Sequence, residues 1–526
     1  MFEIRDEFNI PFTDVELNMF IRDIESTEDG KNKAMFLRFL AGRNLTTLDD
    51  IIAYSGLSEA TTRSCLSFFI GKHIVIYFEE KDSKKTYYCL FAQNITAQYF
   101  APLLLAAINR NYGEVAAKIV SIFLNETARS HAAIISHPQL ISYPNVEAVF
   151  AKLVADKILV SEANFFAASR VAIANLVSDG TDAFAESSKK IGGVRGPSQK
   201  LSTKKKVTAE EASILEKIVE STEFLEESSS LAARGAFCLN FNWLKIHVFT
   251  NKIEELFATV FRAECGKIAR VMLDKGFDHS LSNGIAGSTN AIPLKMICET
   301  IFKSTFKKQK ASKVIEYNEI LDETFENVID DDEDDEEMNP QFVENIHELL
   351  LAMSRDSNSL VSRAGGSGEG SSFTLNIDAA LSLLAKKIID GVLLQSYSEK
   401  ARRIYRILED VGFLTEKELP QVSMMTPVDA REAIYALMRD DLITNNEVSK
   451  TNDFLAARTY QFFGINSNIK KILLERAWKA YDNTRIRLEN IGSTYESDDE
   501  SFITQIHALE IAIRRLTETI IILSGK

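Results

Sequence analysis

The chain has 526 residues, 45% of them hydrophobic, and a formal net charge of −15 at pH 7. This length exceeds what one hydrophobic core serves, so three to five folded domains are expected. The acidic balance disfavours a free-standing nucleic-acid-binding protein, because neutralising phosphates requires a basic face. A chain with this acidic net charge can still carry local basic patches that contact DNA.

Several classes of site are absent from the sequence. The cysteines show no paired spacing, as is typical of reduced thiols in an intracellular protein, and the histidines are scattered without metal-binding spacing. There is no phosphate-binding loop or nucleophile elbow. Met1–Pro11 lacks the basic start of a signal peptide, and no apolar run is long enough for a membrane span. We expect a binding protein with no catalytic residues, metal ion, cofactor or membrane partner.

The first ninety residues predict one complete module. Lys33–Leu40 and Thr47–Tyr54 predict its first two helices, and Ser58 is a suitable N-cap for a third. Residues 73–78 and 86–91 are β-branched and aromatic runs joined by a polar turn, which predicts a two-stranded hairpin. Helix, turn, helix and hairpin together predict a winged helix-turn-helix.

The apolar pattern of this third helix and the strand after it is repeated. Three stretches share the offsets 0, 3, 4, 7, 8, 12 and 13, and a helix-to-strand step at the same place each time is stronger evidence than the helical spacing alone. Residues 342–350 indicate another helix of this kind, although its following strand is not visible in the sequence. The repeated positions are 62, 65, 66, 69, 70, 74 and 75; 146, 149, 150, 153, 154, 158 and 159; and 430, 433, 434, 437, 438, 442 and 443.

A basic segment separates the second and third modules. Residues 178–209 are poor in apolar side chains and rich in glycine, which predicts a flexible linker. A solvated linker, a nucleic-acid contact and a nuclear-import signal all fit this pattern. The candidate nucleic-acid-binding residues are Lys189, Lys190, Arg195, Lys200, Lys204, Lys205 and Lys206.

The second half contains an acidic run, a last module and a helical tail. Residues 330–337 are all acidic and predict a solvated loop that could also shield a basic neighbour. Pro427–Arg439 predicts the third helix of the last module. The tail steps 4, 3, 4, 3 and 4 residues, which is a heptad seam that pairs with its own preceding helix or with a partner. The seam residues are Phe502, Ile506, Leu509, Ile513, Leu516 and Ile520.

These features predict a mainly α fold with small β wings, in which four tandem winged helix-turn-helix domains precede an antiparallel coiled-coil hairpin. The expected divisions are residues 1–95 for the first winged helix, 96–177 for the second, 178–209 for the basic linker, 210–358 for the third with the acidic loop, 359–465 for the fourth and 466–526 for the hairpin.

The sequence resembles a known family in most of its length. The matching stretches are 42–51, 63–66, 73–77 and 86–88 in the first module, 239–256 at the start of the third, and 401–408, 429–432, 449–451 and 458–460 in the fourth. These resemble the four-winged-helix subunit of RNA polymerase III, the largest member of that enzyme's specific heterotrimer. None of the motifs is a catalytic signature, so the resemblance depends on order and coverage.

The resemblance implies a nuclear, non-catalytic polymerase subunit. Such a subunit sits on the clamp of the largest subunit, binds the two smaller heterotrimer subunits and works with initiation factor IIIB. It helps to open promoter DNA at small non-coding RNA genes such as those for tRNA and 5S rRNA. Two alternatives stay open: a free-standing winged-helix regulator that reads a promoter sequence, and a winged-helix scaffold without DNA contact.

Overall fold

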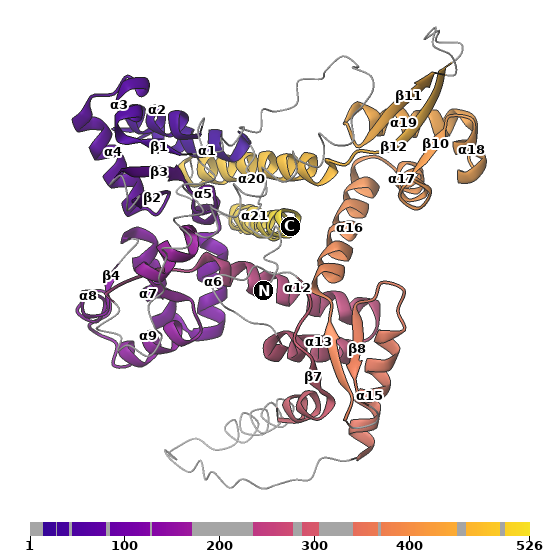
Figure 1. Ribbon diagram of the computed structural model, residues 1–526, viewed down its shortest axis with the longest axis horizontal. Helices are drawn as coiled ribbons and strands as arrows, with labels where there is room; N and C mark the ends of the chain where they lie inside the picture. The colour runs from indigo at the N-terminus through magenta and orange to yellow at the C-terminus, as the bar shows by residue number, and fades with distance from the viewer. Residues whose placement is uncertain are drawn as a thin grey trace. The chain divides into compact units, whose positions relative to one another are not determined.

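The computed structural model in Figure 1 describes residues 14–27, 29–41, 45–79, 85–126, 129–170, 235–276, 287–303, 340–366, 370–449, 459–494 and 500–525. They belong to two compact units. The first unit comprises Met1–Lys245, Ser280–Gly284 and Asp390–Lys526, and the second comprises Ile246–His279 and Ile285–Ile389.

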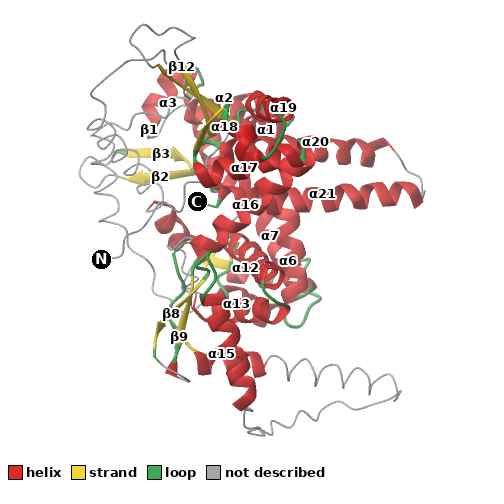
Figure 2. Cartoon of the chain, turned by 90° about the vertical axis from the view of Figure 1, so that its right-hand side faces the viewer, coloured by secondary structure: helices red, strands yellow, loops and turns green. Residues whose placement is uncertain are grey.

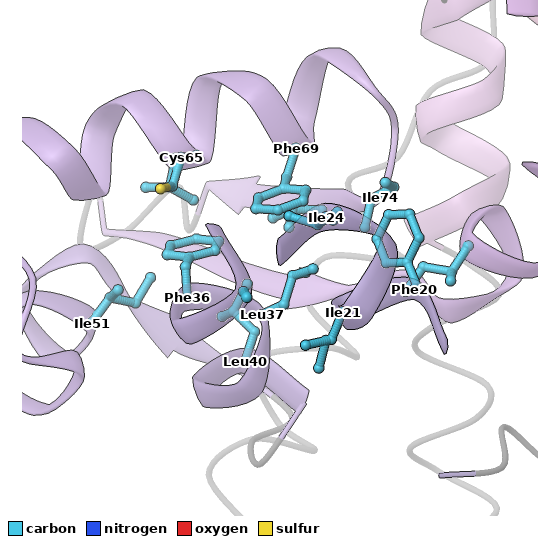
Figure 3. Packing of buried hydrophobic residues seen from close by; sticks show 14 of the residues in the cluster. Phe20, Ile21, Ile24, Phe36, Leu37, Leu40, Ile51, Cys65, Phe69 and Ile74 are labelled. Carbon is cyan, nitrogen blue, oxygen red and sulfur yellow. The ribbon is translucent and has the colours of Figure 1, made fainter. Parts of the chain in front are cut away.

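The first winged helix follows a leading helix. Its third helix begins at Ser58, whose hydroxyl accepts a hydrogen bond from the Thr61 backbone amide, as the N-cap prediction required. Its core joins residues of five helices and the wing, and the Phe36 and Phe69 rings stack with centroids 5.6 Å apart (Figure 3). The elements are α1 (Asp14–Glu25), α2 (Gly30–Ala41), β1 (Thr46–Thr47), α3 (Leu48–Ser55), α4 (Glu59–Gly71), β2 (Val75–Glu79) and β3 (Thr86–Leu90).

The second winged helix is completed by a strand that lies far along the chain. Strand β6 pairs antiparallel with β5, with Leu159 opposite Leu239, and also with β4. The division expected at residue 177 therefore omits a strand of this sheet, because sequence alone does not show which strand pairs across a long intervening segment. The elements are α5 (Ala92–Tyr99), α6 (Ala101–Tyr112), α7 (Glu114–Glu126), β4 (Arg129–Ser130), α8 (His131–Ile135), α9 (Val146–Ala155), β5 (Leu159–Ser161) and β6 (Ala236–Leu239).

The second unit contains the third winged helix. Residues 294–303 are helical, and the strand that the sequence did not reveal after the helix at residues 342–350 is β8. Helices α12 and α16 each contain residues of both units. The elements are α12 (Phe241–Val260), α13 (Ala263–Gly276), β7 (Ile292–Pro293), α15 (Pro340–Ser354), β8 (Val361–Gly365), β9 (Ser372–Leu375) and α16 (Ile377–Ser396).

The fourth winged helix and the tail belong to the first unit. Figure 2 shows the two tail helices side by side with their consecutive ends together, so they run antiparallel as a hairpin. The elements are α17 (Glu399–Val411), β10 (Phe413–Thr415), α18 (Glu418–Ser423), α19 (Pro427–Arg439), β11 (Ile443–Ser449), β12 (Thr459–Ile465), α20 (Ile469–Thr494) and α21 (Glu500–Ser524).

The same strand order recurs in each module. Within the described residues, the strands form four antiparallel sheets with the orders β1-β3-β2, β4-β6-β5, β7-β9-β8 and β10-β12-β11. In each sheet the last strand in sequence lies between the other two, as a winged helix requires. The predicted fold class is confirmed.

A repeated corner explains the repeated apolar pattern. His73, Lys157, Ser359 and Asp441 each have a positive φ, between 53° and 58°, and each directly precedes two buried residues at the start of the wing. This left-handed residue turns the chain from the third helix into the strand, which fixes the helix-to-strand step that the sequence shows.

An asparagine side chain stabilises this corner in three of the modules. The side-chain amide of Asn94 donates to the His73 carbonyl at 2.8 Å. Asn240 donates to the Lys157 carbonyl at 3.0 Å, and Asn466 donates to the Asp441 carbonyl at 2.7 Å. These asparagines form no pattern in the sequence, because each one follows the corner at a different distance along the chain.

Candidate partner and nucleic-acid interfaces

The predicted nucleic-acid-binding residues Lys189, Lys190, Arg195, Lys200, Lys204, Lys205 and Lys206 all lie outside the described residues, as does the acidic run 330–337. Their role therefore stays a prediction. The described residues do allow the third helices of the four modules to be compared as alternative nucleic-acid contacts.

The third helices have no net basic charge. Helices α4, α9 and α19 each contain as many acidic as basic residues, and α15 contains two acidic residues and no lysine or arginine. The Arg63 guanidinium on α4 donates to Glu59 at 2.8 Å, and Arg431 on α19 donates to Glu416 at 2.6 Å. A helix that binds the major groove by itself needs free positive charge. These helices do not form such a surface.

The predicted coiled-coil residues lie along α21 and face α20. Phe502, Ile506, Leu509, Ile513 and Leu516 are half-buried, and Ile520 is buried. The end of α21 is enclosed on all sides, because four consecutive residues, 520–523, are buried and successive helical residues point in different directions. The seam thus contributes to an intramolecular hairpin, and its predicted role in partner binding stays a prediction.

The start of α20 is tied to the fourth winged helix. The Arg476 guanidinium donates to the Tyr397 hydroxyl at 2.8 Å and to the Asp440 backbone carbonyl at 3.1 Å. Tyr397 in turn donates to the Asp440 carboxylate at 2.6 Å. This hydrogen bond is the main cause of the lowered pKa of Asp440. The corner of the fourth module and the first turns of α20 therefore form one network.

The middle of α20 packs on the first unit's opening elements through aromatic rings. Trp478 is 1% exposed and stacks on Phe100, with centroids 5.8 Å apart and planes 14° apart. Tyr99 meets Trp478 and Tyr481 edge to face at 6.1 and 6.2 Å. The Tyr481 hydroxyl also donates to the Tyr99 carbonyl at 2.9 Å. Burial raises the pKa of Tyr481 to about 12, so its hydroxyl keeps its proton at neutral pH.

Two arginine–aspartate ion pairs border the aromatic contact. Each pair joins residues that are at least 460 positions apart in the sequence. Arg22 on α1 donates two hydrogen bonds to Asp482 at 2.8 and 2.6 Å. Arg485 donates two to Asp23, both at 2.8 Å, and Tyr99 donates to the same carboxylate at 2.9 Å. Such two-point pairs are stronger and more directional than ordinary surface ion pairs. We call Arg22, Asp23, Asp482 and Arg485 the α1–α20 clasp.

The electrostatics of the clasp follow from its geometry. The hydrogen bond from Arg22 lowers the pKa of Asp482. Burial lowers the pKa of Arg485, but its hydrogen bond to Asp23 and the negative charges of Asp23 and Glu489 together outweigh this effect, and the net shift is upward. Burial raises the pKa of Tyr99, and the neighbouring Asp23 raises it further. Arg22, Asp482 and Arg485 therefore stay charged through the physiological pH range.

The first two winged helices share a second interface. The outer face of the first wing, with Ile76 and Phe78, packs against Phe165 and Cys238 of the second module. The buried His73 ring lies against the Phe165 ring, with centroids 4.9 Å apart. The first winged helix therefore contacts the second module on one side and α20 on another.

The clasp has no signature in the sequence, for a physical reason. Arg22, Asp23, Asp482 and Arg485 lie on helices with many other charged residues, and no periodicity distinguishes a paired charge from a solvated one. The pair Trp478 and Tyr481, on a helix with few aromatic residues, was the available signal that this face of α20 is buried.

Other site types are not seen in the described part of the chain. It contains no group of three or more histidine, cysteine, aspartate or glutamate residues placed to hold a metal ion. None of its helices is long and apolar enough to span a membrane.

The repeated topology and the hairpin define the class of the molecule: a tandem winged-helix protein whose tail helix joins its first and last modules within one unit. Winged-helix modules of this kind bind nucleic acid in some proteins and other proteins in others, so the class alone does not specify function.

Comparison with known proteins narrows the class. Residues 389–465 match the family model described as the C-terminal winged-helix domain of POLR3C. The DNA-directed RNA polymerase III subunit RPC3 of Danio rerio is 27% identical over 139 residues, and those of Mus musculus and Homo sapiens are 24% and 23% identical over the same length. Each match covers 26% of this chain and 26% of the relative, so it spans about a quarter of their length. The predicted resemblance to the four-winged-helix subunit of RNA polymerase III is confirmed.

Proposed function

We propose that this chain is a non-catalytic subunit of a nuclear DNA-directed RNA polymerase III. The match of residues 389–465 to the POLR3C C-terminal winged-helix domain carries the proposal. It is supported by similarity to relatives named as RPC3 subunits and by three further winged-helix sheets and a hairpin in the described residues.

In this role the chain sits on the clamp of the largest subunit and binds the two smaller heterotrimer subunits. Together with initiation factor IIIB, it helps to open promoter DNA at genes for small non-coding RNAs such as tRNA and 5S rRNA. The neutral or acidic third helices fit a subunit that holds DNA only together with the polymerase. They disfavour a free-standing promoter reader, which needs exposed side chains that contact bases.

Native affinity purification from nuclear extract, followed by mass spectrometry, tests the proposal. Recovery of a complete RNA polymerase III at equal stoichiometry is expected. Recovery of the chain alone, or with a chromatin regulator and no polymerase, contradicts the proposal and favours the free-standing regulator.

The basic linker has its own test. Replacing Lys189, Lys190, Lys204, Lys205 and Lys206 with alanine should weaken promoter retention by the assembled complex and flatten its salt dependence, because fewer counterions are released. Normal assembly with an unchanged salt slope would assign the segment to a linker or import role and favour a scaffold without DNA contact.

The seam is tested by changing Leu509 and Leu516 to aspartate, which places charge between α20 and α21. Co-purification with the polymerase should be lost if the hairpin anchors the subunit. Ala508 and Arg515 are exposed on the same helix, and their change to aspartate is the matched control. Full recovery of the seam variant, with the helical content of the parent, would show that the hairpin is not the anchor.

A further inference from the structure

Exposed apolar side chains are concentrated on the fourth winged helix. Among the described residues, seventeen large hydrophobic side chains are exposed, and eight of them lie within residues 411–460. This segment is about a tenth of the chain, so chance does not explain the concentration. Apolar groups gathered on one surface mark a binding site more often than scattered ones do.

The most exposed of these residues surround one turn. Val422 lies in the last turn of α18, Met424 is its C-cap, and Val428 lies in the first turn of α19, with exposures of 47, 83 and 70%. We call these three residues the α18–α19 knob. Figure 1 shows the two helices within the fourth module.

The knob stands on a fixed turn. The Met425 amide donates to the Pro420 carbonyl at 3.1 Å, which closes the end of α18. On the other side, the Thr426 hydroxyl accepts from the Asp429 amide at 3.2 Å and caps α19, which continues with Pro427. A preordered turn loses little conformational freedom on binding, and this favours affinity.

Met424 is an unfavourable residue for this turn in the free protein. Its φ is +53°, in the left-handed region that side chains with a Cβ adopt at a cost of about 1 kcal/mol. The equivalent turn of the first module, between α3 and α4, has Gly56 with φ +72°. Local structure would favour glycine here, so a strained and highly exposed methionine suggests a role outside the chain.

The charges near the knob argue against a nucleic-acid ligand. Residues 389–465 contain nine lysines and arginines against twelve aspartates and glutamates, a net charge of −3. Lys400 pairs with Asp429 at 2.7 Å, and Arg431 pairs with Glu416 at 2.6 Å, so these two basic side chains near the knob are already neutralised. An apolar centre with methionine, valine and a paired polar rim has the composition of a protein interface.

The shape of the surface decides what kind of protein surface fits it. A side chain that is 83% exposed protrudes, since its own chain covers little of it. A protruding side chain is buried only by a concave surface, whereas an isolated helix or extended peptide is itself convex and requires a groove on this side. The occupant is therefore an apolar pocket on a folded protein.

We propose that the α18–α19 knob inserts into an apolar pocket on another subunit of the polymerase, with Met424 as the central anchor. The identity of the partner rests on the proposed function. The knob is distinct from the predicted coiled-coil seam and from the basic linker, so the chain has a docking surface on its fourth winged helix.

The test compares three forms of the full-length chain in native purification of the polymerase. One is the parent, one carries Met424→Asp with Val428→Asp, and one carries Ile141→Asp, which replaces an apolar residue that is also 70% exposed. Thermal unfolding should be the same for all three within a few degrees, because exposed positions tolerate substitution. Retention should fall at least tenfold for the knob variant only.

A photo-crosslinking amino acid at position 424 identifies the contact. A crosslink to one polymerase subunit, together with the selective loss of retention, supports the pocket. Undiminished retention of the knob variant overturns it, and so does a crosslink to DNA. Parent chains that dimerise through the knob would assign it to a second copy and also overturn the pocket. If the parent itself recovers no polymerase, the proposed function fails, a result distinct from failure of the knob variant alone.

Discussion

The first and fourth winged helices have the same topology but opposite surroundings. In the first, the wing packs against the second module through Ile76 and Phe78, and α20 is bound to another side through the α1–α20 clasp. In the fourth, the cross-strand wing pair Val448 and Tyr460 is exposed, and the turn before the third helix presents Met424. One module is bound within its own chain, and the other keeps an apolar surface exposed.

This difference shows that the fold leaves the surface free to diverge. The positions at offsets 0, 3, 4, 7, 12 and 13 are buried in both modules, and offset 8 is half-buried, because they form the core. The exposed positions determine whether a module joins its own chain or another protein. Helix α20 contacts both modules, and the variants below test whether its contacts to the first are as tight as their geometry indicates.

The largest effect is expected from Trp478→Ala. The substitution removes a fully buried ring that packs on Tyr99 and Phe100 beside the α1–α20 clasp, and changes of this kind cost about 3–5 kcal/mol. Chemical denaturation of the full chain should show this loss in the free energy of unfolding of the first unit. Val448→Ala in the exposed wing is the control and should change it by less than about 0.5 kcal/mol. Equal effects of the two variants would contradict the comparison.

A smaller effect is expected from reversing one charge of the clasp. Arg485→Asp places a second carboxylate beside Asp23, where the arginine now binds. The Arg485 side chain is 21% exposed and the Asp23 side chain 30%. We expect a loss of about 2 kcal/mol, below that of a fully buried pair because solvent reaches these groups. Adding Asp23→Arg should restore part of it, although the new arginine meets Arg22. A double mutant no more stable than Arg485→Asp would show that the clasp contributes no specific pairing.

The clasp also predicts a pH dependence. Asp482 has a lowered pKa in the folded state, so its pairing stabilises the fold above its ordinary value of 3.8. That contribution is lost as the pH falls through the still lower folded value. Stability attributable to Asp482 should therefore be constant from pH 5 to 8 and decline below about pH 4. Asp482→Asn should remove this part of the decline, and a variant with the parent's acid profile would contradict the assignment.

The sequence predicted what depends on local pattern. The third helices at Thr62, Val146 and Ala430 and their wings follow from the periodicity of buried residues, and the hairpin follows from its seam. The pairing of β6 with β5 and the clasp between Asp23 and Arg485 depend on which distant segments meet, and no local pattern contains that information. The knob was missed because an exposed methionine is noteworthy only once its backbone conformation is known.

A third variant pair compares the corners of the two modules. Asn94→Ala leaves the buried His73 carbonyl without its donor, and we expect a loss of about 2 kcal/mol. Asn466→Ala removes the same bond to Asp441, but that site is exposed and water can replace the amide, so about 0.5–1 kcal/mol is expected. Unfolding of each variant in denaturant measures the difference. A larger loss at Asn466 would contradict the view that the first module is the more enclosed of the two.

The smallest effects on stability are expected at the turns before the third helices of the first and fourth modules, at Gly56 and Met424. Gly56→Ala meets no atom within 4 Å of the added Cβ, so its cost comes only from the positive φ and should be about 1 kcal/mol. Met424→Gly removes the same strain in the fourth module, although glycine also gains freedom in the unfolded chain. The free energy of unfolding of Met424→Gly should therefore equal that of the parent or exceed it by up to about 0.5 kcal/mol. Retention by the polymerase should fall. If Met424 serves binding and not stability, its replacement should weaken retention without destabilising the chain. If Met424→Gly destabilised the chain by 1 kcal/mol or more, the side chain would have a structural role in the free protein, and the turn would not be evidence for a partner.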